Sequence, residues 1–274
     1  MGKIIAILNE KGGVAKTTTT KNLAVALAMY GKNVLAVDLD SSASLTTSLG
    51  VDDSMYEHTI CDVFNKLIAY EDIPEKFAII HQNEKIDLIP SEYNLREYDV
   101  KINAATDREY LLHAFIEEIK DDYDYILLDC PGGTGVLTTN ALLAADELII
   151  PTSANFLAID AMQGMFRRIS QIRKMNVRRY GKEYATKPEL IGILFSMIRL
   201  NTNQDKENMA ILRETYAQNN VPIFETFIPL SVNFSYSDEA GESIFKYAEN
   251  TASSSVFMDF VNEFLYREGL SENK

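Results

Sequence analysis

Two glycines, a lysine and a threonine lie close together in the stretch NEKGGVAKTTTT, residues 9–20. Gly12 and Gly13 allow the backbone to curl so that successive N–H groups point at phosphate oxygens. The ammonium group of Lys16 can reach a β- or γ-phosphate, and the hydroxyl of Thr17 can ligate Mg²⁺. The alternative is an ordinary glycine-rich turn that carries a solvated lysine.

The spacing departs from the common phosphate-loop pattern G-x-x-x-x-G-K-[ST]. Glu10 replaces the first glycine of that pattern and Ala15 replaces the last. A Cβ atom at position 15 costs free energy if the turn needs a positive φ there. We therefore expect nucleotide binding to persist with altered affinity or turnover.

The neighbouring segments decide between these interpretations. The apolar run KIIAIL (3–8) precedes the loop, and a helical pattern over 16–30 follows it. Strand, glycine-rich loop and helix form the context that a phosphate loop needs, and the helix N-terminus adds its positive end. This order favours the phosphate-binding interpretation.

Carboxylates end two further apolar runs. NVLAVD (33–38) ends in Asp38 and is followed by Asp40, and YILLD (125–129) ends in Asp129. A carboxylate at a strand tip beside a phosphate loop can hold the Mg²⁺ shell or orient an attacking water. The alternative for the first pair is that it caps the next helix.

Short apolar runs alternate with helical patterns along the whole chain, which predicts an α/β fold with a doubly wound, mostly parallel sheet flanked by helices. Without repeats or linkers, residues 1–274 are expected to form a single domain. Ligands in such sheets bind beyond the C-terminal ends of the strands. The predicted strands are 3–8, 33–38, 85–90, 125–129, 147–151, 190–196 and 222–229, and the predicted helices are 16–30, 56–69, 107–120, 138–145, 157–176, 204–219 and 253–266.

Composition narrows the class of protein. The chain has two cysteines far apart in sequence and no apolar run of 18 residues, so we expect a cytoplasmic protein with no membrane span. The C-terminal amphipathic stretch 254–269 carries acidic residues on its polar side, which favours core packing over membrane binding. The net charge of −14 argues against a nucleic-acid binder unless basic residues cluster.

KGGVAKTTTT resembles the deviant phosphate loop KGGxxK[ST] of the ParA/MinD ATPases. Segments such as DYDYILLDCPGG and IPTSANFLAIDAM extend the resemblance over nearly the whole chain and place it nearest the ParA (Soj-like) partition subgroup. The resemblance implies that Lys11 reaches across a nucleotide-sandwich dimer, that Glu10 is no defect, and that ATP and Mg²⁺ are the cofactors.

The resemblance also assigns site residues. It implies that Lys11, Lys16 and Asp40 are catalytic, that Thr17, Asp38 and Asp129 serve the metal, and that adenine lies near Met197 and Pro229. The expected nucleotide-binding residues of the loop are Lys11, Gly12, Gly13, Val14, Ala15, Lys16, Thr17 and Thr18.

Arginines that relatives use for non-specific DNA binding are largely missing from the late segments, where Arg199 is a nearby substitute. A second basic surface is FRRISQIRKMNVRRYGK (166–182), with seven basic residues and no acid, in a chain whose remainder carries −21. The alternatives for this helix are a solvated basic face or a docking face for a protein cargo. The candidate DNA contacts are Arg167, Arg168, Arg173, Lys174 and Arg199.

These observations predict an ATPase that dimerises on binding ATP and partitions plasmid or chromosomal DNA on the nucleoid, hydrolysing ATP slowly to ADP and phosphate. A ParB-like DNA-binding adaptor is the expected partner and stimulator. One alternative is a ParA-like ATPase that positions a protein cargo without binding DNA directly. The other is a metabolic ATP-dependent enzyme on the same fold.

Overall fold

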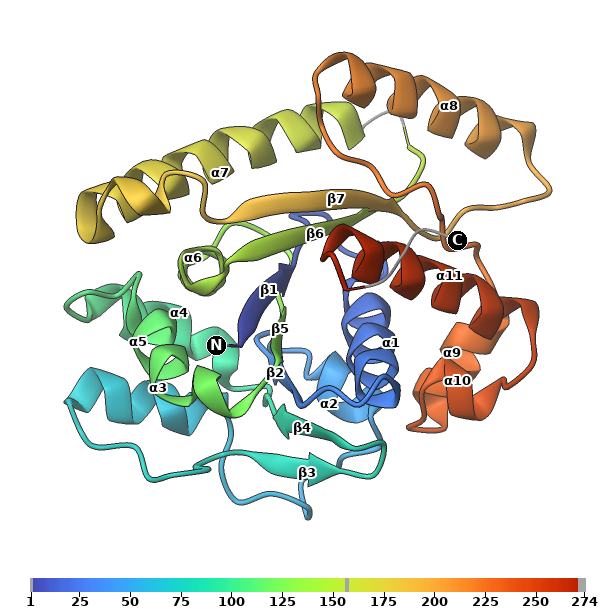
Figure 1. The fold of residues 1–274 in the computed structure, drawn as a ribbon. Coiled ribbons are helices and arrows are strands. Elements are labelled where there is room, and N and C mark those ends of the chain that lie inside the picture. The colour runs from blue at the N-terminus through green and yellow to red at the C-terminus, as the bar shows by residue number, and fades with distance from the viewer. Residues whose placement is uncertain (1, 156–157, 271–274) are drawn as a thin grey trace.

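The computed structural model describes residues 2–155 and 158–270, and within this part of the chain seven strands form one sheet in the order β3-β4-β2-β5-β1-β6-β7 (Figure 1). Every neighbouring pair is parallel except β3 and β4 at one edge. The predicted doubly wound, mostly parallel sheet is therefore confirmed. The strands are β1 Lys3–Ile7, β2 Val34–Asp38, β3 Ile80–Gln82, β4 Ile86–Ile89, β5 Tyr125–Asp129, β6 Glu147–Thr152 and β7 Glu189–Phe195.

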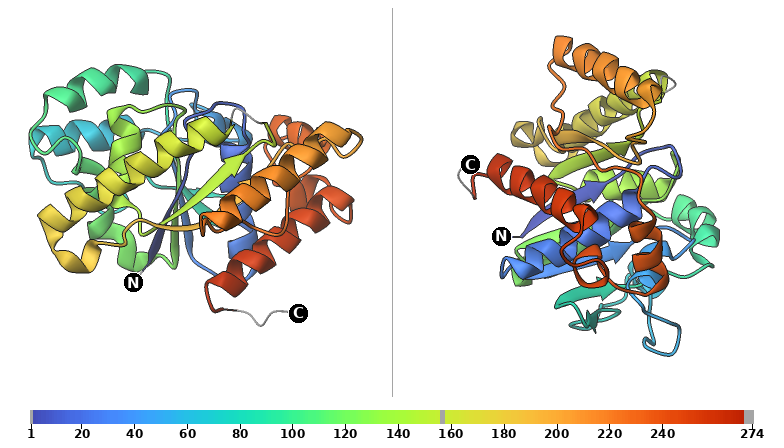
Figure 2. Two further views of the ribbon diagram at one scale, coloured as in Figure 1. Left: turned by 90° about the horizontal axis from the view of Figure 1, so that it is seen from above. Right: turned by 90° about the vertical axis from the view of Figure 1, so that its right-hand side faces the viewer.

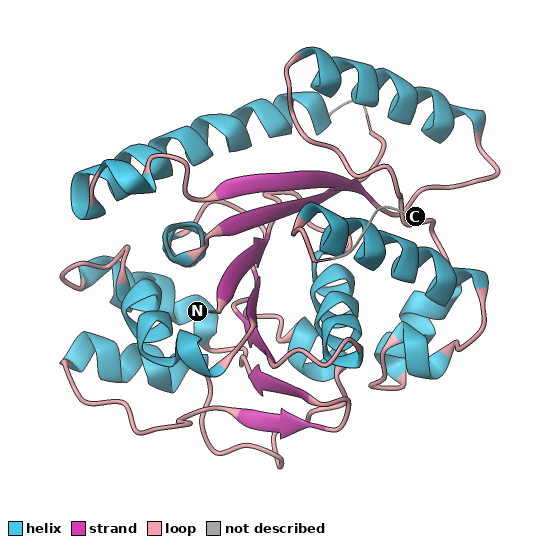
Figure 3. Ribbon diagram, in the orientation of Figure 1, coloured by secondary structure: helices cyan, strands magenta, loops and turns pink. Residues whose placement is uncertain are grey.

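Helices cover both faces of the sheet, as the three views show (Figures 2 and 3). One face is covered by α1, α2 and α9–α11, and the other by α3–α7, with α8 beyond β7. The helices are α1 Lys16–Met29, α2 Ser44–Ser48, α3 Ile60–Ala69, α4 Leu95–Ala104, α5 Leu111–Ile119, α6 Val136–Ala144, α7 Ala158–Tyr180, α8 Asn203–Gln218, α9 Val232–Glu239, α10 Ile244–Tyr247 and α11 Ala252–Arg267, with 3₁₀ turns at Lys120–Asp122 and Lys182–Tyr184.

The central strand β1 explains why the sheet is covered on both sides. Ile4 and Ala6 join the hydrophobic core beneath α3–α7, whereas Ile5 and Ile7 join the core beneath α1 and α9–α11. All four side chains are buried, as expected of a parallel strand with helices on both faces. This burial fixes the depth of β1 and therefore the position of the loop at its C-terminal end.

One predicted strand is wrong. Segment 222–229 runs beside β7 but makes isolated bridges instead of a continuous ladder. The carboxylate of Glu263 on α11 accepts the backbone N–H groups of Glu225 and Thr226, at 2.8 and 2.9 Å. These two donors are thus satisfied by a side chain, and the segment leaves the sheet between its two bridges.

Several short elements do not appear among the predictions, namely β3, α2, α4, α9 and α10. The first residue of the predicted helix 157–176, position 157, lies outside the described residues, and α7 continues to Tyr180. The predicted core packing of the C-terminal helix is confirmed, because Phe257, Phe260 and Phe264 of α11 are fully buried. In the part of the chain that the structure describes, no helix has the length and apolar character needed to cross a bilayer.

Candidate nucleotide site

The glycine-rich loop lies between the C-terminal end of β1 and the start of α1 at Lys16. Asn9 anchors its first residues, because the Asn9 side chain donates to the carbonyl of Pro151 at 2.8 Å and accepts the N–H of Lys11 at 2.9 Å. Gly13 has a φ of 68°, which glycine adopts without steric cost. The loop therefore turns back over the N-terminus of α1, where backbone N–H groups are available to an anion.

Ala15, the position where a glycine is expected, has a φ of 65° and a ψ of 34° as the residue that precedes α1. A second alanine, Ala43, adopts the same left-handed conformation before α2, with a φ of 50°. Each costs an L-residue roughly 1 kcal/mol or more relative to the right-handed region. The predicted condition for strain at Ala15, a positive φ, is therefore met.

Asp129 at the end of β5 lies directly beneath the loop. Its carboxylate accepts hydrogen bonds from Thr17 Oγ1 at 2.7 Å and from Thr20 Oγ1 at 3.2 Å. Burial raises the pKa of the Asp129 carboxyl, and the carboxylate of Asp38 raises it further. The register explains this repulsion, because Asp38 and Asp129 are paired on adjacent strands.

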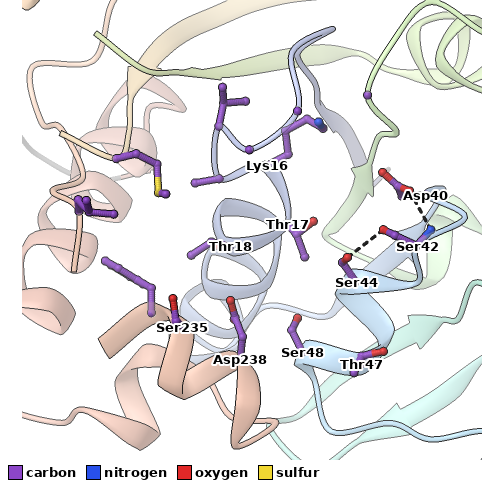
Figure 4. Close-up of a pocket in the computed structure, with 18 of the residues that line it drawn as sticks. Lys16, Thr17, Thr18, Asp40, Ser42, Ser44, Thr47, Ser48, Ser235 and Asp238 are labelled. Atoms are coloured by element: carbon purple, nitrogen blue, oxygen red, sulfur yellow. Dashed lines mark hydrogen bonds between the residues drawn. The ribbon is translucent and has the colours of Figure 1, made fainter. Parts of the chain in front are cut away.

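Asp38 supports the segment that follows β2. Its carboxylate accepts the N–H and hydroxyl of Thr46, at 2.9 and 2.8 Å, and the N–H of Asp40 at 3.1 Å. Burial raises the pKa of the Asp38 carboxyl, and these three hydrogen bonds oppose that shift. Asp40 in turn lines the cavity and accepts the N–H of Ser42 at 2.9 Å (Figure 4). Asp38 thus holds Asp40 in place and does not itself line the cavity.

The two lysines of the loop lie in different environments. Lys16 is 8% exposed and lines the cavity, with its ammonium group 3.5 Å from the carbonyl of Lys11. Lys11 is exposed and lies outside the cavity lining. Gly132 packs beside them, since a Cβ atom there would be 3.9 Å from Lys16 Nζ.

A cavity of about 810 Å³ opens above the loop, within the usual size range of small-molecule sites. Residues Gly12–Thr18 form its floor, and Figure 4 shows α2 on one side and α9 on the other. Met197 lines it as predicted, whereas Pro229 does not and the next residue, Leu230, does.

The wall formed by α9 does not appear in the sequence predictions. It contributes Phe234, Ser235, Asp238 and Glu239 to the cavity. A helix start could have been inferred from Ser231, whose side chain accepts the N–H two residues on. The wall of α2 contributes Ser44, Thr47 and Ser48, which were also not predicted.

The predicted DNA contacts on α7 divide into two groups. Arg167 and Lys174 are exposed. Arg173 is half-buried and donates from Nε and Nη2 to the carbonyl of Pro188, at 3.1 and 2.8 Å. Arg168 is half-buried and donates to the loop that precedes α6. The first pair is free to meet a partner, and the second pair already holds the protein's own backbone.

Arg199 lies near the end of β7, away from α7. It forms a bidentate pair with Asp205, with Nη2–Oδ1 at 2.8 Å and Nε–Oδ2 at 3.1 Å. The Asp205 carboxylate also accepts the backbone N–H of Arg199 at 2.9 Å. The positive charge of Arg199 is therefore largely neutralised at its own surface.

The donor set fits magnesium and a nucleotide phosphate. Among the described residues, no group of three or more His, Cys, Asp or Glu side chains gathers as a metal cluster. Mg²⁺ in phosphate sites, however, is held by one or two protein oxygens, phosphates and waters. The Thr17 hydroxyl and the buried, negatively biased Asp129 supply such oxygens beside Lys16.

Comparisons with known proteins agree with this arrangement. A family model described as "AAA domain" matches residues 2–180. The sporulation initiation inhibitor protein Soj of Bacillus subtilis is 32% identical over 263 residues, which cover 96% of this chain and 98% of Soj. The chromosome partitioning protein ParA of Caulobacter vibrioides is 28% identical over 97% of this chain and 95% of its own.

A solved structure resembles the fold as a whole. Cobyrinic acid a,c-diamide synthase from Mycobacterium smegmatis, with bound ADP and magnesium, has a TM-score of 0.78 at 26% sequence identity. The match covers 98% of this chain and 96% of that one. The same fold therefore holds a magnesium nucleotide in a protein of a different activity.

Proposed function

Because this chain belongs to the ParA/MinD-type family of ATPases, we propose that it is a dimerising, Mg·ATP-dependent ATPase that partitions DNA. Two subunits would close face to face around two Mg·ATP molecules, and slow hydrolysis to ADP and phosphate would open them. A ParB-like DNA-binding adaptor, encoded by a neighbouring gene, would stimulate hydrolysis. The named partition proteins among the relatives support this output.

The observation that carries the proposal is the different placement of Lys11 and Lys16. Lys16 is buried in the cavity floor, where one lysine suffices to contact the phosphates of a bound nucleotide. Lys11 is exposed beside it, outside the same cavity. An exposed lysine at the rim is suited to a phosphate in a second subunit's site and adds little to its own.

The remaining residues divide the chemistry among them. Thr17 and Asp129 would hold Mg²⁺, which when bound neutralises phosphate charge. Lys16 and the loop N–H groups would bind the phosphates, and Asp40 would orient the attacking water. Asp38 would keep Asp40 at the cavity rim through the hydrogen bond to its N–H. Most of the rate enhancement would come from positioning and charge stabilisation.

The test is the variant Lys11→Ala, with Lys85→Ala on the distant β3–β4 turn as a control for loss of an exposed lysine. We expect Lys11→Ala to stay folded and to bind one nucleotide per subunit. ATP turnover and ATP-dependent dimerisation, measured by phosphate release and analytical ultracentrifugation, should both be lost. Full turnover in a monomeric Lys11→Ala variant would overturn the sandwich mechanism.

A metabolic enzyme on the same fold is the second candidate function, favoured by the likeness to the diamide synthase. Such an enzyme would form a product from ATP and a small substrate, and its turnover would not need Lys11. The Lys11→Ala measurement therefore separates the two candidates.

DNA contact is proposed for one face of α7. Arg167, Lys174 and Arg178 are all exposed, and their spacing of seven and four residues aligns them on one side of the helix. No acidic residue occurs between positions 163 and 182 to neutralise them. Three aligned positive charges in an otherwise acidic protein form a local surface suited to DNA phosphates.

The matched experiment reverses charge only at exposed positions. The double variant Arg167→Glu/Lys174→Glu should abolish ATP-dependent DNA binding, and the salt dependence of binding by the single variants should fall by about 1 per lost phosphate contact. Lys76→Glu/Lys85→Glu, which reverses two exposed lysines elsewhere, controls for net charge. If wild-type protein with ATP binds no DNA at low salt, the DNA role is refuted.

That last outcome would favour an ATPase that positions a protein cargo. The pairing of Arg199 with Asp205 and the net charge of −14 both point in this direction. The α7 face would then dock an acidic partner protein.

A further inference from the structure

Arg168 forms the contact between α7 and the loop that follows β5. Its Nη2 atom lies 2.9 Å from the carbonyl oxygen of Thr134, 3.3 Å from that of Gly135 and 2.7 Å from Thr139 Oγ1. Burial lowers the pKa of the Arg168 guanidinium, and Glu10 at the front of the phosphate loop opposes that shift. One half-buried cation is therefore held against two backbone carbonyls and a hydroxyl.

The loop that Arg168 holds has little stiffness of its own. Residues 130–135, here called the β5–α6 loop, include Gly132, Gly133 and Gly135, and Gly133 has a φ of 108° that few other residues adopt. The N-terminal residue of α6 has no side-chain cap, because Gly135 precedes it. The conformation of this loop must be set by its neighbours.

Those neighbours contact the loop from opposite sides. A Cβ atom on Gly132 would lie 3.7 Å from the carbonyl oxygen of Glu10 and 3.9 Å from Lys16 Nζ, so the loop packs on the phosphate loop. A Cβ atom on Gly135 would lie 3.3 Å from Asp99 of α4. Hydrogen bonds to the carbonyls of this segment from outside come from Arg168.

The same helix carries the exposed basic face. Arg167 is adjacent to Arg168 in sequence and is exposed, and a Cβ on Gly164, one turn earlier, would lie 3.9 Å from a carboxylate oxygen of Glu10. A shift of α7 therefore acts on both the phosphate loop and the β5–α6 loop. The helix connects a candidate partner surface to the nucleotide site through side-chain contacts on the page of this structure.

We propose that Arg168 is a positioning residue that fixes the β5–α6 loop against the phosphate loop and so couples α7 to nucleotide turnover. Its role in turnover rests on the proposed ATPase function, whereas its hold on the loop does not. Arginine suits this role because its planar group presents several donors in a fixed geometry. A lysine ammonium at the same place satisfies fewer of the three acceptors at once.

The test compares Arg168→Gln and Arg168→Lys with the control Arg167→Gln, which removes an adjacent but exposed arginine. Amide hydrogen exchange is measured with and without Mg²⁺ and the slowly hydrolysed analogue ATPγS. In Arg168→Gln we expect exchange over residues 133–139 to be about tenfold faster or more, with β1 and β5 unchanged. Arg168→Lys should recover part of the protection, and Arg167→Gln should match wild type.

Turnover supplies the second readout. We expect kcat of Arg168→Gln to fall about tenfold while KM for ATP changes little, because the loop acts on the reacting end of the nucleotide. Exchange and kcat equal to those of Arg167→Gln would overturn the proposal. So would faster exchange spread evenly over the sheet, since that outcome marks general destabilisation.

The two proposals fail separately. If wild-type protein hydrolyses no ATP, the proposed function fails, and protection of residues 133–139 by Mg·ATPγS still decides the role of Arg168. Loss of that protection in Arg168→Gln alone supports the positioning role. Equal protection in wild type and Arg168→Gln refutes it.

Discussion

The ammonium group of Lys21 on α1 forms an ion pair with the carboxylate of Asp238 on α9, 217 residues later in the chain. The Lys21 side chain is fully buried, whereas that of Asp238 is 36% exposed at the cavity wall. Lys21 also donates to the carbonyl of Glu242 at 2.8 Å and to that of Ser48 at 3.3 Å. Burial lowers the pKa of Lys21, and Asp238 opposes that shift. This pair joins the floor of the cavity to the wall that α9 supplies.

The two partners of this pair should contribute unequally to stability. Asp238→Asn leaves a buried cation with neutral partners, and we expect the free energy of unfolding to fall by about 3 kcal/mol. Lys21→Met removes the buried charge and leaves Asp238 in contact with water, so we expect a smaller loss of about 1 kcal/mol. Urea unfolding without nucleotide measures both. The reverse order would contradict this account of the pair.

Ala15→Gly should stabilise the protein. A glycine removes the steric cost of the left-handed conformation before α1, and after its greater unfolded-state entropy is counted we expect a gain of about 1 kcal/mol. Ala210→Gly, in the exposed interior of α8, is the opposite control and should cost about 1 kcal/mol. Thermal unfolding of the two variants checks the sign. Destabilisation by both would show that Ala15 carries no backbone strain.

Thr17→Ala tests the magnesium site. The variant removes the hydroxyl that lies 2.7 Å from Asp129, and we expect affinity for Mg·ATP to fall about tenfold or more. Without magnesium, in EDTA, wild type and variant should bind ADP alike, because the loop N–H groups and Lys16 are intact. Fluorescent-nucleotide titrations in both conditions measure the difference. A loss of affinity that is the same in EDTA would place Thr17 on the phosphates and not on the metal.

A pH dependence is expected at the opposite end of the sheet. Lys3 Nζ pairs with Glu147 at 2.8 Å and with Glu268 at 2.6 Å, so two carboxylates share one ammonium group. Burial, with repulsion from Glu268, raises the pKa of Glu147 from 4.5 to about 7 in spite of Lys3. Between these pH values the native state binds more protons than the unfolded state.

Stability from Glu147 is therefore present below pH 4.5 and is lost as the pH rises to about 7. Relative to Glu147→Gln, which does not titrate, the unfolding free energy of wild type should fall by roughly 2 kcal/mol between pH 4.5 and 7.5. Urea unfolding of both proteins at the two pH values gives the difference. A constant difference across this range would refute the shifted pKa of Glu147.

The phosphate end of the site was predictable from the sequence because its signals are local. Gly12, Gly13, Lys16 and Thr17 follow a buried strand directly, and the fold places them where that context implies. Asp129 was predictable for the same reason, since an apolar strand that ends in a carboxylate brings it to the same edge.

The far wall was less predictable because it depends on contacts between distant segments. Segment 222–229 has the composition of a strand, but Glu263 binds two of its N–H groups and its continuation carries Leu230 instead of Pro229 into the cavity. Arg168 and Arg173 resemble Arg167 and Lys174 in sequence, and only the packing of α7 decides which charges face inward. Patterns of residue type cannot show that choice.

The cavity joins the beginning of the chain to its end, and this has a consequence for synthesis. Residues 12–18 emerge from the ribosome early, whereas α9, at 232–239, emerges after most of the chain has been made. Domains form from the N-terminus during translation, so the phosphate loop waits for its opposite wall. A nascent chain without α9 lacks half of the nucleotide cavity, and full nucleotide affinity thus marks a chain whose translation is nearly complete.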